Sequence, residues 1–164
     1  MSNNKRTANW ERLIPLFQSY VDTFGAELGG MVIDYIARMI GGYRISFPEK
    51  LTPITRHSES WVILAQFYDV LCSDLSKIEM PKAPEEFRNG SRLSGNRIGQ
   101  VVMKEMFRRL KGHRISFVRL EEMHRIERDE KIRKERKEHG TSVTVLAERS
   151  GLDEVTIWRI LREE

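Results

Sequence analysis

An internal repeat restricts the possible folds of this chain more than any other feature of its sequence. Residues 25–47 align without gaps on residues 95–117, at a constant offset of 70 positions. Nine of the aligned positions are identical, including the run Arg-Ile-Ser-Phe that ends each copy. This is far more identity than chance would give in so short a window. The chain therefore contains two copies of one supersecondary unit.

Each copy predicts a helix followed by a short strand. Apolar residues recur at helical spacing in both copies, and a glycine, Gly42 or Gly112, then ends the helix as a C-cap. In the Arg-Ile-Ser-Phe run, Ile and Phe face one side of a strand and Arg and Ser face the other. A lone short strand leaves backbone groups unpaired, so we expect the two strands to form a small ribbon, within one chain or between two chains.

The remaining segments predict further helices. Apolar and aromatic residues at helical spacing indicate a helix opening at Trp10, another over Trp61–Leu75 and a long charged helix over residues 119–138. Residues 76–95 contain prolines and glycines and are expected to form a linker. We predict a mainly α fold: a helical domain with two short β-strands forming a small ribbon, followed by a C-terminal helix-turn-helix.

This organisation divides the chain into three predicted regions. Residues 1–87 hold the first helix–strand repeat with flanking helices and resemble a dimerisation unit. Residues 88–118 hold the second helix–strand repeat. Residues 119–164 comprise the long helix and the helix-turn-helix, and are predicted to be the DNA-binding domain.

Residues 142–161 have the pattern of a helix-turn-helix. Ala147 supplies the small residue needed where the two helices cross, and Gly151, four positions later, tolerates a positive φ at the turn. Asp153 can cap the second helix. Ser150 departs from the pattern, because an apolar residue is commoner there. The apolar residues that fit the interhelix core are Leu146, Leu152, Ile157 and Ile160.

The second helix of this motif carries the predicted DNA contacts. In a DNA-bound helix-turn-helix, the early residues of that helix reach base edges in the major groove. Arg159 suits guanine, and Glu154 suits the amino group of cytosine. Thr156 and Arg162 are expected to meet phosphates. The full set of predicted base contacts is Glu154, Val155, Trp158 and Arg159.

Basic residues are concentrated in the middle of the chain. The net charge is only +4, but residues 88–137 contain 16 Lys or Arg and 7 Asp or Glu. Such a segment suits a polyanion such as DNA. Many of these charges alternate in sign, so a solvated helix with many ion pairs is an equal alternative. Residues 138–164 are net acidic. A helix-turn-helix that docks a protein instead of DNA is therefore another alternative.

The sequence contains no pattern typical of an enzyme or a metal site. It has no phosphate loop, no Cys-x-x-Cys and no His-Glu-x-x-His, and its four histidines lack metal-ligand spacing. We therefore expect no catalytic activity, no metal and no cofactor. The single cysteine, Cys72, gives no reason to expect an oxidising compartment. Residues 1–10 hold no apolar run and residues 28–40 are too short to span a bilayer, so we expect a cytoplasmic protein without a membrane partner.

Several segments match the pattern of one known family. They are Arg128–Ile132, Gly140–Val143, Leu146–Leu152 and Thr156–Arg159, together with Gly41–Pro48, which looks like a helix end with paired glycines followed by a strand and a proline. These segments resemble the Mor family of phage middle-operon transcription activators. The resemblance implies a dimeric phage or prophage activator that binds double-stranded DNA and recruits the host RNA polymerase. It also makes Arg44 and Arg114, on the strands, candidate contacts to the DNA backbone or minor groove.

Two features depart from the family pattern. The helix–strand unit occurs twice, so one chain can form an intrachain pseudo-dimer in place of the family's homodimer. Only the second copy is followed by a helix-turn-helix, and Leu51–Leu75 looks like a copy that lost DNA binding and became core. The leading hypothesis is a DNA-binding transcription regulator. The alternatives are a DNA-binding phage protein for packaging or partition, and a helix-turn-helix that serves as a protein-interaction module.

Overall fold

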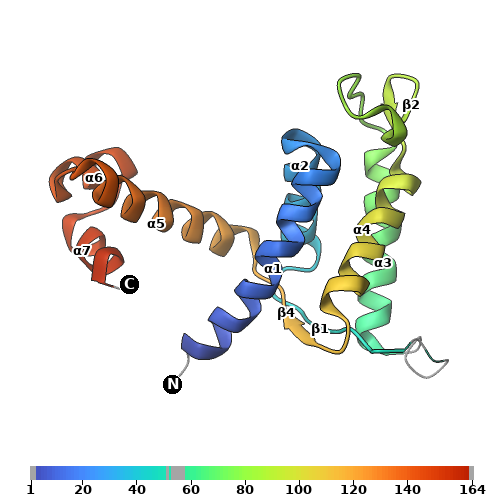
Figure 1. The fold of residues 1–164 in the computed structure, drawn as a ribbon, viewed down its shortest axis with the longest axis horizontal. Coiled ribbons are helices and arrows are strands. Elements are labelled where there is room, and N and C mark those ends of the chain that lie inside the picture. The colour runs from blue at the N-terminus through green and yellow to red at the C-terminus, as the bar shows by residue number, and fades with distance from the viewer. Residues whose placement is uncertain (1–2, 51, 53–57, 163–164) are drawn as a thin grey trace. The chain divides into compact units, whose positions relative to one another are not determined.

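The computed structural model of the protein describes residues 3–50, 52 and 58–162. These residues form seven α-helices and two pairs of short antiparallel strands (Figure 1). The mainly helical fold with a small two-stranded ribbon is thus as the sequence predicted. The chain divides into two compact units, unit 1 (Met1–Arg119) and unit 2 (Leu120–Glu164).

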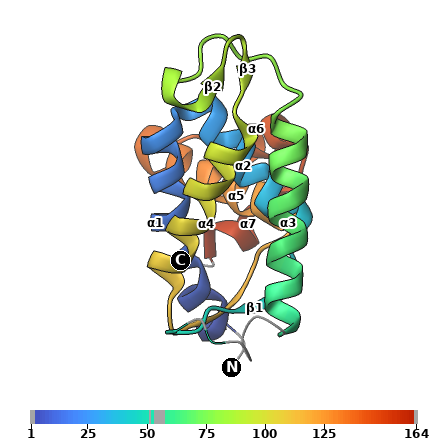
Figure 2. The ribbon, with the colours of Figure 1, turned by 90° about the vertical axis from the view of Figure 1, so that its right-hand side faces the viewer.

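Unit 1 contains both copies of the repeat. A hairpin, β2–β3, lies at the end of α3 and α4 that is remote from the ribbon β1–β4 (Figures 1 and 2). The sequence predicted a linker over residues 76–95, where the structure instead has this hairpin, turning at Gly90 with φ 66°. The elements of unit 1 in chain order are α1 (Asn3–Phe24), α2 (Ala26–Met39), β1 (Arg44–Ser46), α3 (Glu59–Leu75), the 3-10 turn η2 (Glu85–Phe87), β2 (Arg88–Asn89), β3 (Arg92–Leu93), α4 (Gly95–Leu110) and β4 (Arg114–Ser116).

The two repeated strands pair with each other inside the chain. β1 and β4 are antiparallel, with Ile45 opposite Ile115, while Arg44 and Arg114 each lie opposite the serine of the other strand. Ile45 and Ile115 are equivalent positions of the repeat, so the ribbon has an approximate two-fold axis through this pair. Of the two pairings that the sequence left open, the structure shows the intrachain one.

Backbone hydrogen bonds beyond the strands follow the same symmetry. The Gly42 N–H donates to the Phe117 carbonyl oxygen at 2.8 Å, and the equivalent Gly112 N–H donates to the Phe47 carbonyl oxygen at 2.7 Å. Both glycines have positive φ, 88° and 75°, which a residue without a Cβ adopts readily. The sequence predicted these glycines as C-caps, but the caps of α2 and α4 are Ile40 and Lys111, so the glycines lie just beyond the helix ends and start the ribbon.

One hydrophobic core combines both copies. The side chains of Ile45, Phe47, Ile115 and Phe117 are exposed by 3% or less, whereas the arginines and serines of the strands are exposed. This is the alternation that the sequence predicted. The apolar faces of α1, α2, α3 and α4 join the same core. The ribbon therefore connects the two halves of unit 1 by both backbone pairing and burial.

The structural repeat is longer than the repeat recognised in the sequence. α1 packs on α2 where Gly29 approaches the backbone of Val21, and α3 packs on α4 where the equivalent Gly99 approaches Cys72. Val21 and Cys72 are 51 positions apart, and the same offset relates the buried apolar residues of the two helices. These pairs are Leu13 and Leu64, Leu16 and Phe67, Tyr20 and Leu71, and Phe24 and Leu75.

This correspondence corrects one expectation. The sequence suggested that Leu51–Leu75 is a copy that lost DNA binding and became core; residues 59–75 do belong to the core, but the structure gives them another counterpart. Within that segment, residues 59–75 instead form α3, a single helix that occupies against α4 the place that α1 occupies against α2. The repeated unit is therefore helix–helix–strand. The insertion of residues 76–94 in the second copy changes the offset from 51 to 70.

Unit 2 consists of three helices around a small core of its own. They are α5 (Leu120–His139), α6 (Val143–Ser150) and α7 (Glu154–Arg162). α6 begins at Ser142, whose side chain accepts the Val145 N–H. It ends at Gly151, which has φ 67° as the sequence predicted. The buried core comprises Ile132, Leu146, Ala147, Ile157 and Ile160, with Val143, Leu152 and Leu161 packed against it.

Candidate nucleic-acid interface

Four of the predicted DNA contacts share one exposed face of α7. Val155 is 78% exposed and Trp158 is 49% exposed, although both are large apolar side chains. Arg159 and Arg162 are exposed beside them, and these four residues line one open hollow. The opposite side of α7 is anchored in the core of unit 2. The face is thus held outward by packing on its reverse side.

Two other predicted contacts have partners inside unit 2. The Thr144 hydroxyl donates to the Glu154 carboxylate at 2.7 Å. The backbone N–H and the hydroxyl of Thr156 donate to the Asp153 carboxylate, each at 2.8 Å. These bonds from Thr156, the backbone one first, hold the pKa of Asp153 below its ordinary value. Asp153 therefore caps α7 as predicted, and Glu154 and Thr156 help to fix the first turn of the helix.

A basic face of α5 adjoins α7, and the sequence reasoning did not single it out. Arg133, Arg136 and Lys137 line a second hollow together with Trp158 and Leu161. Their i, i+3, i+4 spacing puts them on one side of the helix. A charge count by segment does not show this cluster, whereas assignment of each charge to a helical face does.

Hydrogen bonds hold two of these arginines in place. The Arg133 Nε donates to the Ile160 carbonyl oxygen at 3.0 Å, which connects α5 to α7. The Arg136 Nη1 donates to the carbonyl oxygens of Gly140 at 3.2 Å and Thr141 at 2.8 Å, just beyond the end of α5. The basic face is therefore built into the packing of unit 2.

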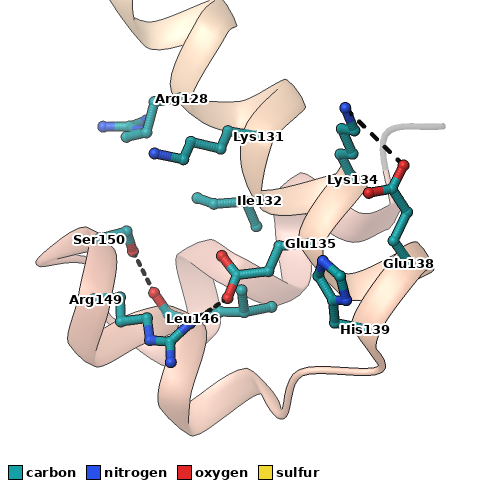
Figure 3. A pocket seen from close by; sticks show the side chains of 10 residues that line it. All are labelled: Arg128, Lys131, Ile132, Lys134, Glu135, Glu138, His139, Leu146, Arg149 and Ser150. Atoms are coloured by element: carbon teal, nitrogen blue, oxygen red, sulfur yellow. Dashed lines mark hydrogen bonds and ion pairs between the residues drawn. The ribbon is translucent and has the colours of Figure 1, made fainter.

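The other side of α5 carries both acidic and basic side chains. Figure 3 shows the hollow between α5 and α6, where the Glu135 carboxylate points toward Arg149 and forms an ion pair with it. Lys134 and Glu138 form a second, looser pair with 4.0 Å between Nζ and Oε1. The lining of this hollow mixes the cations of Arg128, Lys131, Lys134 and Arg149 with the carboxylates of Glu135 and Glu138, so it is not a surface of one charge.

The predicted backbone contacts of the ribbon lie in unit 1. Arg44 and Arg114 are both exposed on the outer side of β1 and β4. Nearby, the Arg12 Nη1 lies 2.9 Å from the His113 Nε2, at the turn into β4. The residues predicted to touch DNA are thus divided between the ribbon of unit 1 and α7 of unit 2.

Other kinds of site are not found in the part of the chain that the structure describes. No group of three or more His, Cys, Asp or Glu in this part is placed to hold a metal ion. None of the described helices combines the length and the apolar character needed to cross a membrane. Burial raises the pKa of the Cys72 thiol, which therefore stays protonated at neutral pH.

The chain matches no protein-family model, no curated protein and no solved structure. The resemblance to the Mor family accordingly stays a prediction that depends on the residues quoted above. The exposed face of α7 and the residues around it are the basis for a functional proposal.

Proposed function

We propose that the protein is a DNA-binding transcription regulator in which α6 and α7 form a helix-turn-helix and α7 enters the major groove. The observation that carries this proposal is the outward face of α7, where Val155 and Trp158 lie exposed next to two arginines. Exposed apolar groups beside cations are typical of a surface that binds a partner. A short helix fixed by its N-terminal cap and its buried side suits insertion into a groove.

The chemistry of this face suits particular base edges. Arg159 can donate two hydrogen bonds to the O6 and N7 atoms of guanine, and Val155 can contact the methyl group of thymine. The Glu154 carboxylate keeps acceptor capacity for a cytosine amino group beyond its bond from Thr144. Arg162, in the last turn of α7, suits a phosphate at the edge of the groove.

We further propose that one chain carries a single reading unit. The strands that the Mor resemblance expects to join two subunits pair within this chain, and the described residues contain one α6–α7 pair. A pseudo-dimer of this kind would bind an asymmetric site. Activation through host RNA polymerase depends on the Mor resemblance, and in vitro transcription from a template bearing the selected site would test it.

Selection of random duplex DNA by the full chain at physiological salt tests the proposal. We expect enrichment of a short asymmetric site, because one α7 reads one half-site. An enriched palindrome would show that two chains bind together and would contradict the single reading unit. Failure to bind duplex DNA at all would contradict the regulator and favour a protein-interaction module.

Substitution of Arg159 tests the assignment of the reading helix. Arg159→Ala should weaken binding to the selected site by about 1–3 kcal/mol and relax the preference at one base position. The control is Arg38→Ala, which removes an exposed arginine from α2 of unit 1. If Arg159→Ala keeps its fold by circular dichroism and binds as the parent does, α7 is not the reading helix.

A further inference from the structure

Trp158 lies at the junction of two hollows that together bring five cations to one surface. On one side it adjoins Arg159 and Arg162 of α7. On the other side it adjoins the basic face of α5, which comprises Arg133, Arg136 and Lys137. Among the residues that the structure describes, no acidic residue lines either hollow. The hollow between α5 and α6 differs, because the carboxylates of Glu135 and Glu138 lie among its cations and pair with two of them.

We propose that the basic face of α5 binds phosphates of duplex DNA beside the groove that α7 enters. The inference rests on the proposed function and adds a second helix to its DNA-binding surface. Because the two hollows meet at Trp158, the basic face of α5 continues directly from the reading face of α7. The walls of the major groove carry phosphates, so a cation row flanking an inserted helix meets negative charge.

The arrangement favours binding because much of it is already ordered. Arg133 is held by its bond to the Ile160 carbonyl oxygen and Arg136 by its bonds at the end of α5. A guanidinium has five N–H donors, so these bonds leave donors for a phosphate. Side chains that are positioned before binding lose less entropy on association. The bond from Arg133 to α7 also fixes the rotation of α5 about its own axis. Lys137 therefore stays on the side of α5 that faces Trp158.

The test is the salt dependence of binding by the full chain. Each phosphate contact made by a lysine or arginine contributes about 0.9 to the slope of the logarithm of affinity against the logarithm of salt concentration. Lys137→Gln should therefore lower the magnitude of this slope by about 0.9. The side chains of Arg133 and Arg136 donate to backbone carbonyl oxygens of unit 2, so their removal would also disturb the fold. Lys137 is chosen because its side chain makes no such bond in the part of the chain that the structure describes.

Lys131→Gln is the matched control, because Lys131 lies on the opposite side of the same helix, in the hollow of Figure 3. It removes the same charge from α5 and should leave the slope unchanged. Trp158→Ala removes no charge, so it should weaken binding while keeping the slope. Equal slopes for Lys137→Gln, Lys131→Gln and the parent would overturn the proposal.

The experiment distinguishes failure of the α5 proposal from failure of the proposed function. If Arg159→Ala relaxes the base preference while Lys137→Gln keeps the slope of the parent, α7 reads DNA and the role of α5 is wrong. If the parent chain binds no duplex DNA, both proposals are wrong. If both substitutions act as expected, α5 and α7 form one DNA-binding surface.

Discussion

Close helix packing in unit 1 depends on single glycines. A Cβ atom built on Gly29 would lie 2.7 Å from the Cα of Val21 in α1, and its neighbours there are all backbone atoms. At the equivalent Gly99, a Cβ would lie 2.5 Å from the Sγ of Cys72 in α3. The two glycines therefore set the distance between the helices of each half, which explains why both copies keep them.

The pair Gly29 and Gly30 offers a test of this role. Gly29→Ala should destabilise the protein by about 1–3 kcal/mol, because α1 must move to admit the methyl group. Gly30→Ala is the control, since a Cβ there would meet nothing within 4 Å. It should stabilise α2 by roughly 0.5–1 kcal/mol, because alanine loses less conformational entropy than glycine in a helix. Urea denaturation of both variants would measure the difference, and equal stabilities would contradict the packing argument.

A second residue-scale feature is the ion pair network of Glu105 in α4. Arg108 donates to both carboxylate oxygens, at 3.0 and 2.8 Å, and Arg109 donates to one of them at 2.9 Å. The bonds from Arg108, and then those from Arg109, lower the pKa of Glu105 to about 2. Because the folded pKa is below the unfolded one, ionised Glu105 contributes its full stabilisation above about 4.5 and loses it as the pH falls toward 2.

The expected consequence is a pH-dependent effect of Glu105→Gln. The substitution should lower the melting temperature at pH 7, where the carboxylate is ionised in the parent. The difference between variant and parent should shrink as the pH falls from about 4.5 to about 2. Thermal unfolding across this range measures it. A difference that stays constant with pH would show that the charge of Glu105 contributes nothing to stability.

At the scale of elements, the turn between α6 and α7 determines how the exposed face of α7 is presented. Gly151 has φ 67° and ψ 24°, and its N–H donates to the Ala147 carbonyl oxygen. The Leu152 N–H donates to the same oxygen at 3.2 Å, as in a Schellman motif. The chain thus reverses within three residues, and Asp153 then caps α7.

Gly151→Ala should strain this turn without any clash. A Cβ there would meet nothing within 4 Å, so the cost is the left-handed backbone alone, about 1–2 kcal/mol. Gly151→Asn is the matched control, because asparagine tolerates this conformation better than alanine. Amide hydrogen exchange of α6 and α7 should show faster opening in Gly151→Ala than in Gly151→Asn. Equal exchange in both variants would show that the positive φ is not what maintains the turn.

At the scale of the whole molecule, the intrachain ribbon determines the expected assembly. β1 and β4 each have two edges, and each uses one edge to pair with the other strand. The apolar residues of the ribbon are buried in the core of the same chain. The repeat therefore completes within one chain the pairing that would otherwise require two.

We accordingly expect the full chain to be a monomer at micromolar concentration. Light scattering would measure a mass near the 19.3 kDa of one chain. A mass near twice this value would show an interface other than the β1–β4 pairing, since that pairing is already made within the chain. Repeating the measurement with the selected DNA would give the number of chains on one site.

The sequence by itself determined the local features of this protein. The helical spacing of apolar residues, the alternation in Arg-Ile-Ser-Phe, the positive φ at Gly151 and the cap at Asp153 all follow from interactions within a few residues. The outward positions of Val155, Trp158 and Arg159 were also predicted, because Ile157 and Ile160 define the buried side of α7. Such features need no knowledge of distant segments.

Only the tertiary structure decided which distant segments meet. It paired β1 with β4 inside the chain, matched α3 to α1, and placed the basic face of α5 beside Trp158. It also gave Glu154 a partner in Thr144, ten residues earlier. A periodic pattern shows which side of a helix is apolar, but every apolar side fits many partners equally well. The choice among them depends on shape and volume at each crossing, such as those at Gly29 and Gly99, and packing of the whole core determines it.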